Sequence, residues 1–247
     1  MFLLGPSHHY YLAGAATTAC DRYATPLGDL VVDTALVGEM QQAWGLETMS
    51  QRVDEDEHSL EMHLPYIHKM LSYHNQSFQA APSSVPLVPL LIGNTSETTE
   101  AHYGNLLAPY LADPSNLFVI SSDFCHWGSR FRYTYYQPAD GAPVTQLRSN
   151  SRVPPDYPIH ESIAAVDRET MDAVESGDHG RFWEQLRATG NTVCGRHPIG
   201  VFMAAVEKAE GLGDGKGRFR FLRYERSGLV ENAKDSSVSY CSAFAVL

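Results

Sequence analysis

Residues 121–128, with the sequence SSDFCHWG, carry three side chains capable of chemistry directly after an apolar run. The run, residues 116–120, is rich in β-forming residues and follows a turn-forming Asp-Pro-Ser, a pattern that predicts a buried strand of an α/β sheet. Ligands of such sheets bind beyond the carboxyl ends of the strands. The pattern therefore predicts a site at Asp123, Cys125 and His126.

Asp123 and His126 lie three positions apart, so the carboxylate could orient the imidazole or form a general-base pair with it. Cys125 lies between them in an alternating segment and is expected to point into the core. Trp127 is expected to pack in the same way, with a pocket wall as the alternative.

His8 and His9 follow the apolar run 2–5 and a Pro-Ser pair. Such a loop can present an imidazole at the edge of a sheet, although an exposed turn is the alternative. Adjacent residues on extended backbone point to opposite sides, so only one of the two histidines is expected to face a given site.

Cys194 immediately precedes a predicted helix that has Pro198 in its first turn. The positive helix end, with Arg196 and His197 nearby in sequence, would favour the thiolate, which is the metal-binding and nucleophilic form. A buried, inert cysteine packed under the helix explains the pattern equally well.

Two further clusters are ambiguous. Arg130 and Arg132 alternate with aromatic residues up to position 136, which could hold an anion such as a phosphorylated side chain, although a strand surface is the simpler reading. His58, Glu61 and His63 do not match the HExxH metal motif. At helical spacing His58 and Glu61 share a face and are expected to support a site, whereas His63 is expected to be structural.

Strands alternating with helices predict a mixed central α/β sheet flanked by helices on both faces. Strands are expected at residues 2–5, 15–23, 85–93, 116–120, 218–226 and 236–247. Helices are expected at residues 34–44 capped by Asp33, 58–71 kinked at Pro65, 97–111 capped by Ser96, 160–176, 178–189 and 198–210. A long surface loop with five prolines is expected at residues 137–158, and a flexible turn at 211–217.

The composition fits one domain spanning residues 1–247. A formal charge of −11 argues against nucleic-acid partners. The four cysteines are scattered without a CxxC pair, which fits a reducing intracellular setting, and no apolar stretch approaches a bilayer span. We therefore expect no membrane insertion and a cytoplasmic location, with the nucleus as a second compartment.

Several segments strongly resemble the Memo family, the mediators of cell motility. The matching blocks are GPSHH at residues 5–9, TPL at 25–27, DEDEHSLEMHLPY at 54–66, LADPSNLFVISSDFCHWGSRFRY at 111–133, CGRHPIG at 194–200 and DSSVSY at 235–240. The resemblance covers nearly the whole chain, apart from the insertion at 137–158. It also implies that a segment with a Pro-His-Ala-Gly-Tyr block, present in the family, is missing upstream of Met1.

The family's fold is similar to the LigB-type class III non-haem iron extradiol dioxygenases, whose iron ligands are two His and one carboxylate. The resemblance implies that His8 and Cys194 are ligands for copper or iron, with a third ligand in the absent upstream block. His126 matches the dioxygenase catalytic base, with Asp123 beside it. Supporting roles are expected for His9, His58, Glu61 and His197, and contacts to phosphotyrosine peptides of receptor kinases for Tyr23, Arg130 and Arg132.

The leading hypothesis is a Memo-like protein whose copper or iron site has a redox or metal-handling role linked to cell motility and signalling. The alternative is a non-catalytic adaptor that binds phosphotyrosine peptides in the same cleft. A ring-cleaving extradiol dioxygenase is disfavoured, because a Cys stands where the enzymes have a carboxylate ligand.

Overall fold

The computed structural model describes residues 1–78, 85–139, 141–209 and 215–247, and their side chains other than those of 74–78. Two compact units can be distinguished by their internal contacts. The first comprises Met1–Ser121 and Gly195–Ala205, and the second comprises Ser122–Cys194 and Val206–Leu247. The expectation of one domain over 1–247 stays a prediction.

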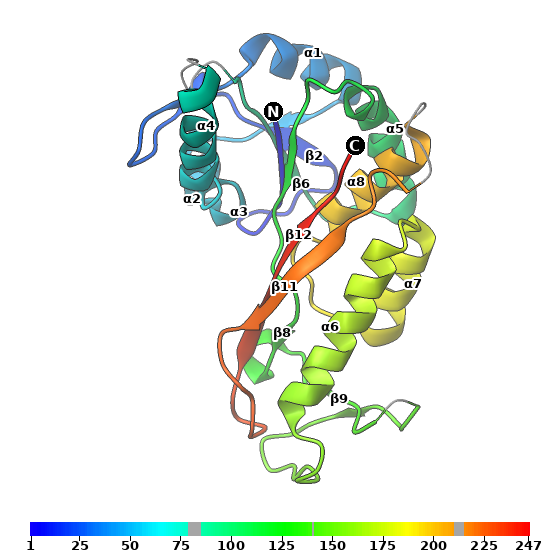
Figure 1. Ribbon diagram of the computed structural model, residues 1–247. Helices are drawn as coiled ribbons and strands as arrows, with labels where there is room; N and C mark the ends of the chain where they lie inside the picture. Colours follow the sequence, from blue (N-terminus) through cyan, green and yellow to red (C-terminus); the bar gives the residue numbers. More distant parts are fainter. Residues whose placement is uncertain (79–84, 140, 210–214) are drawn as a thin grey trace. The chain divides into compact units, whose positions relative to one another are not determined.

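The first unit contains a five-stranded mixed sheet (Figure 1). Its strands follow the order β5 (Glu47–Thr48), β2 (Ala15–Thr17), β6 (Val88–Ile92), β1 (Phe2–Pro6) and β7 (Phe118–Ile120). Strand β1 runs parallel to both β6 and β7, whereas β2 is antiparallel to β6. The chain that leaves the carboxyl end of β1 therefore emerges between two neighbouring strands, which is the position that such sheets use for ligands.

Helices cover both faces of this sheet. Successive side chains of β1 point to opposite faces, and all of them are buried, so each face needs a cover. Leu3 packs in a core cluster with Leu60 of α3 (His58–Glu61) and with the start of α4 (Leu64–Phe78). Its neighbour Phe2 stacks on Phe118 and lies 5.1 Å from the ring of Tyr110 in α5 (Glu97–Leu111). The predicted α/β class, a mixed sheet flanked by helices, is confirmed.

Side-chain caps fix two helices where the sequence predicted them. The Asp33 carboxylate accepts the backbone N–H of Leu36 at the start of α1 (Thr34–Trp44). Ser96 accepts the N–H of Thr99 at the start of α5. Each cap satisfies an N–H that has no partner within its helix. The helix expected from Pro198 begins slightly earlier, as α8 (Arg196–Lys208), with Pro198 still in its first turn.

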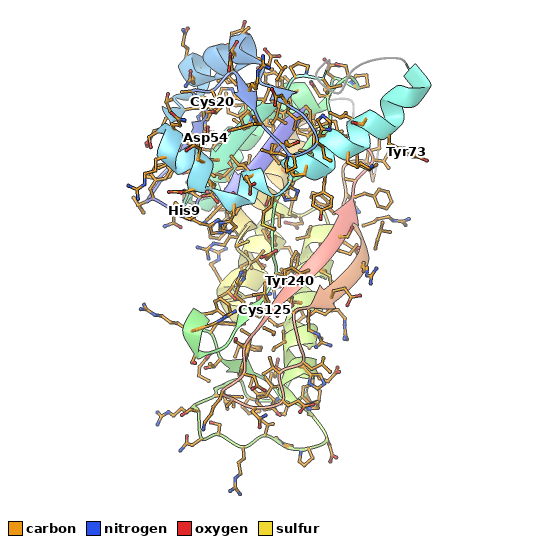
Figure 2. The ribbon with its side chains drawn as sticks, turned by 90° about the vertical axis from the view of Figure 1, so that its left-hand side faces the viewer. His9, Cys20, Asp54, Tyr73, Cys125 and Tyr240 are labelled. Atoms are coloured by element: carbon orange, nitrogen blue, oxygen red, sulfur yellow. The ribbon has the colours of Figure 1, made fainter. Side chains whose placement is uncertain are left out.

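The single kinked helix expected over 58–71 is wrong. The segment contains α3 and the first part of α4, with a break at Met62 and His63, and a further helix, α2 (Gln51–Asp56), precedes it. Pro65 is the second residue of α4, where a missing N–H costs nothing because that position has no partner inside the helix. The helix is therefore interrupted before the proline. Tyr73 projects from the outer side of α4 (Figure 2).

The strand expected over 15–23 is also broken. It forms β2 and then β3 (Arg22–Tyr23), and β3 pairs with β4 (Leu30–Val31) in a separate hairpin. A turn at residues 25–28 joins them, with reciprocal backbone hydrogen bonds between Thr25 and Gly28. Between β2 and β3, the Thr18 hydroxyl accepts the backbone N–H of Cys20, and this local turn ends the extended segment.

The second unit contains the predicted terminal pair of strands, β11 (Arg220–Arg226) and β12 (Ser237–Phe244), as an antiparallel pair. The short strand β8 (His126–Trp127) joins the other side of β12. Helices α6 (Ile159–Glu175) and α7 (His179–Thr189) lie at the predicted positions. A buried cluster that includes Trp127 and Ile163 forms the core between the strands and α6.

The loop expected over 137–158 contains more structure than predicted. Its β10 (Thr145–Gln146) pairs antiparallel with β9 (Tyr135–Tyr136), and the Tyr136 hydroxyl donates to the carbonyl of Tyr157. The flexible turn expected at 211–217 falls largely outside the described residues. Across the described ranges, no helix combines the length and apolar character that a membrane span requires.

Candidate functional site

His8 and Glu57 form a close polar contact near the carboxyl end of β1. The His8 ring Nδ1 lies 2.9 Å from Glu57 Oε1, and the His8 backbone N–H donates to Oε2 over 2.8 Å. The fully buried carboxylate also accepts the N–H of Ser59 at 3.1 Å. A carboxylate can only accept, so Nδ1 must carry the proton and the lone pair of a neutral His8 ring lies on Nε2.

The charge of Glu57 is maintained by its hydrogen bonds. Burial alone would raise its pKa, but the bonds from the ring and backbone of His8 and from the backbone of Ser59 lower the pKa to about 2. Hydrogen bonds to the charged form of a carboxyl group favour that form. At neutral pH the His8 ring therefore faces a permanent negative charge.

The imidazole of His58 stacks on His8, with the ring centroids 4.3 Å apart. His9 meets His58 edge to face, with the ring centroids 5.7 Å apart. The rings of the adjacent residues His8 and His9 therefore contact His58 in different orientations. His8, Glu57 and His58 offer ligand atoms that all lie within 4.8 Å of one another. Among the described His, Cys, Asp and Glu side chains, this is the group of three whose spacing suits a metal ion.

The predicted supporting carboxylate, Glu61, is exposed at the end of α3, whereas Glu57 is the residue that contacts His8. A single helix over residues 58–71 would place His58 and Glu61 on a shared face and leave Glu57 outside the helix. The break between α2 and α3 instead makes Glu57 the residue that caps α3 and turns its side chain inward. His63, between α3 and α4, is half-buried.

Tyr23 belongs to a second buried contact of the first unit. Its hydroxyl donates to Asp54 Oδ1 over 2.6 Å, and the Thr18 hydroxyl donates to Oδ2 of the same carboxylate. Burial, followed by the charge of Asp54, raises the pKa of Tyr23 far above its ordinary value. The Tyr23 side chain is therefore a neutral phenol whose hydroxyl is hydrogen-bonded to the Asp54 carboxylate. Asp54 and His9 are labelled in Figure 2.

His197 is buried on α8 within the first unit. Its Nδ1 lies 2.7 Å from Glu100 Oε1 and 3.0 Å from the Thr95 hydroxyl. Glu100 fills the space that a side chain at Gly200 would need. These contacts join α8 to α5, so the structure gives His197 a packing role in addition to any supporting role at a site.

In the second unit, Thr192 holds His126 through three hydrogen bonds. The Thr192 hydroxyl accepts the backbone N–H of His126 at 2.8 Å and donates to its carbonyl at 2.9 Å. The Thr192 carbonyl lies 3.0 Å from the ring Nδ1 of His126, and the Phe124 carbonyl lies 2.9 Å from the same atom. Carbonyls only accept, so this ring also carries its proton on Nδ1 and has its lone pair on Nε2.

Asp123 lies beside this second histidine, as the spacing predicted. Its Oδ2 is 3.8 Å from His126 Nε2, which is longer than a hydrogen bond but within ion-pair distance if the ring is protonated. The Asp123 side chain is about half exposed. The Asp123 carboxylate therefore lies on the Nε2 side of the ring, away from the Nδ1 atom that the two carbonyls contact.

Cys194 is half-buried and contacts the same segment. Its Sγ accepts the backbone N–H of Asp123 at 3.1 Å, and its thiol donates to the Asp123 carbonyl over 3.7 Å. The intermediate burial of Cys194 also differs from that of a packed, inert cysteine.

Cys125 and Trp127 belong to the core, as predicted. Both are fully buried, and the Trp127 indole donates to the Tyr135 carbonyl over 2.8 Å. Burial, followed by the charge of Asp167, raises the pKa of the Cys125 thiol well above its ordinary value. Cys125 is labelled in Figure 2.

The strand surface expected around Arg130 and Arg132 is wrong. Residues Ser129–Phe131 form a 3-10 turn, and Arg132 follows it in the left-handed conformation with φ 57°. The guanidinium of Arg130 lies over the Phe131 ring at 4.4 Å. Both arginines are exposed, whereas the tyrosines at 133, 135 and 136 are buried. The arginines and these tyrosines therefore do not form one exposed surface.

The fold and these contacts define an α/β protein with two oriented histidines. His8 follows strand β1 and His126 lies in the short strand β8. Each ring is held through Nδ1, so a neutral ring has its lone pair on Nε2. The Memo-like protein family model matches residues 1–244, and the chain belongs to this family. It is 43% identical to human Protein MEMO1 over 242 residues, which cover 98% of this chain and 73% of that protein. The zebrafish (Danio rerio) Protein MEMO1 is 42% identical over 247 residues, covering 100% of this chain and 75% of the relative. The Protein memo-1 homolog of Caenorhabditis elegans is 40% identical over 242 residues, covering 98% of this chain and 62% of the relative.

Proposed function

We propose that this Memo-like chain binds copper or iron and has a redox or metal-handling role, with His8 and Cys194 as protein ligands. The observation that carries the proposal is the hydrogen bond between the His8 ring Nδ1 and the Glu57 carboxylate. Metal-binding histidines usually donate their second ring N–H to a carboxylate or carbonyl, which fixes the ring and raises its basicity. His8 has this arrangement, with a carboxylate that is buried and ionised.

Each proposed ligand is supported by contacts within its own unit. Glu57 orients the His8 ring, and the Asp123 backbone N–H donates to Cys194 Sγ. An imidazole and a soft thiolate together suit copper or iron better than magnesium or calcium, which prefer oxygen. Such a metal, when bound, would supply one-electron exchange.

His126 is proposed as an acid or base that acts at Nε2. Thr192 and the Phe124 carbonyl hold the proton on Nδ1, so Nε2 is the atom that can accept a second proton. Asp123 would stabilise the charged ring. A link to cell motility and signalling is part of the same proposal and rests on family membership.

The proposal is tested by a copper(I) competition titration against a chromogenic chelator, with Cys194→Ala compared with Cys241→Ala. Both thiols are free and half-buried, so they form a matched pair. The first change should weaken copper(I) binding by roughly 10- to 100-fold or more, since losing a ligand exceeds the cost of losing its support. Equal affinities for the two variants would contradict the proposal.

A second candidate function is binding of phosphotyrosine peptides, favoured by the exposed cations Arg130 and Arg132 on the 3-10 turn. Arginine pairs well with phosphate. If peptide binding is independent of the metal, Cys194→Ala should leave it unchanged, whereas Arg130→Glu should remove it. Fluorescence anisotropy with a labelled phosphotyrosine peptide and its unphosphorylated form measures both effects.

A further inference from the structure

A groove of ≈ 760 Å³ lies wholly within the second unit, around the start of β11 and the end of β12. Its lining combines cations with aromatic and apolar side chains, namely Lys216, Arg218, Phe219, Arg220, Phe221, Leu222, Phe244 and Val246, together with Glu175 and Gly215. None of the roles described above uses this groove. Its volume falls in the range of pockets that hold small organic ligands, roughly 300–1,000 Å³.

The positive charge of this region is unusual for the chain. Five of its 18 Lys and Arg residues lie between positions 216 and 226, although the protein as a whole has a formal charge of −11. Two of these five have partners outside the groove lining. Arg223 pairs with Glu225 at 2.9 Å, and Arg226 donates to the His160 carbonyl over 2.6 Å.

The three remaining cations, Lys216, Arg218 and Arg220, line the groove. Within the described ranges, no carboxylate lies within ion-pair distance of any of them. The lining carboxylate, Glu175, accepts the backbone N–H of Phe221 at 2.7 Å and so supports the strand. Among the described residues, the groove lining therefore carries three cations and one carboxylate, an excess of positive charge.

The walls of the groove indicate more than a simple anion site. Leu222 and Val246 are 70% and 62% exposed, and Phe244 is 43% exposed. The side chain of Arg218 passes over Gly177, where a Cβ added to the glycine would lie 3.1 Å from Arg218 Cγ. Guanidinium groups match phosphate geometry well, and exposed rings and aliphatic side chains favour an apolar or planar group.

We propose that this groove binds a phosphate ester that also carries an apolar or planar group. The chemistry is shared by soluble nucleoside phosphates and by the headgroups of anionic lipids. The site is independent of His8, Cys194 and His126, so the proposal stands or falls separately from the proposed metal function.

The test measures binding of a fluorescent nucleoside triphosphate by anisotropy at low ionic strength. The double variant Arg218→Glu/Arg220→Glu is compared with Arg148→Glu/Arg152→Glu, which makes the same change of charge at exposed positions of the same unit outside the groove. We expect saturable binding by the wild type, competition by pyrophosphate, and a loss of at least roughly tenfold in the groove variant alone. Arg218→Gln/Arg220→Gln, checked by circular dichroism, gives the same comparison without adding negative charge.

A second arm measures co-sedimentation with phosphatidylcholine vesicles, with and without phosphatidylserine. Binding that requires phosphatidylserine and is lost only in the groove variant assigns the phosphate to a lipid headgroup. Binding of the soluble probe alone assigns it to a free phosphate ester. Failure of the wild type to bind either probe, or equal losses in the groove and control variants, overturns the proposal.

Discussion

Each of the two units contains a histidine held through Nδ1 and a fully buried carboxylate, but only the first unit joins them. In the first unit Glu57 contacts the ring of His8 directly. In the second, neutral carbonyls hold the ring of His126, while Asp167 accepts the backbone N–H of the preceding residue, Cys125. The buried carboxylate of the first unit, Glu57, therefore faces the His8 imidazole. The buried carboxylate of the second unit, Asp167, contacts the backbone beside His126 and not its ring.

The pKa values of the two carboxyl groups follow this difference. Interaction with His8 and two backbone N–H groups lowers the pKa of Glu57 to about 2 despite burial. Burial raises the pKa of Asp167, although hydrogen bonds from neutral partners, including Asn191, Tyr224 and Cys125, lower it in part. Glu57 can thus orient the His8 ring in the way that carboxylates orient metal-binding histidines, whereas Asp167 supports the backbone at Cys125.

Among the groups that support the two histidines, the largest expected effect comes from removing the charge that faces His8. Glu57→Gln keeps the shape but places an amide where the His8 ring and backbone donate, so it should lower copper(I) affinity by roughly 10- to 100-fold. Glu61→Gln, at the exposed carboxylate that the sequence favoured, is the control and should have no effect. Chelator competition measures both, and equal affinities would remove the distinction between the two acids.

A smaller effect is expected at the second histidine. Thr192→Val removes the hydroxyl that bonds the backbone N–H and carbonyl of His126, and should lower the free energy of unfolding by about 1–3 kcal/mol. The Thr192 and Phe124 carbonyls remain, so the His126 ring should keep its proton on Nδ1. Urea unfolding measures the first effect and nitrogen-15 NMR of the ring the second.

Thr192→Ser, which keeps the hydroxyl, is the matched control for this change and should recover most of the lost stability. A move of the His126 proton to Nε2 in Thr192→Val would show that the hydroxyl, and not the carbonyls, selects the tautomer.

The smallest effect concerns the pH dependence of stability through Asp167. A carboxyl group whose pKa is raised by folding binds its proton more tightly in the folded protein. Its contribution is therefore most favourable below its ordinary pKa and declines as pH rises through the raised value. The stability of the wild type relative to Asp167→Asn should thus decrease from mildly acidic to neutral pH. Urea unfolding across this range checks the sign, and a rising difference would contradict it.

Local signals in the sequence predicted most of the fold. Ser96 and Asp33 mark helix starts because their caps act within a single turn, and alternation placed Cys125 in the core. The break before Pro65 was missed because the apolar spacing continues across α3 and α4. Whether a proline kinks a helix or starts a new one depends on packing that this spacing does not report.

The candidate site was predicted less completely. His8, Cys194, Asp123 and His126 carried recognisable motifs, but the residues that hold them did not. Thr192 lies 66 positions from His126, and Glu57 lies 49 positions from His8. Such partners become visible only when tertiary structure brings the segments together. Glu57 had one weak signal, as the last acid of the run at 54–57.

The most direct test of the account compares copper(I) affinity in His8→Gln and His9→Gln, a matched pair of neighbouring imidazoles. The account predicts that the first change weakens binding strongly, because Glu57 orients His8 as the metal ligand, and that the second leaves binding unchanged. Equal losses in the two variants, or a larger loss for His9→Gln, would contradict it.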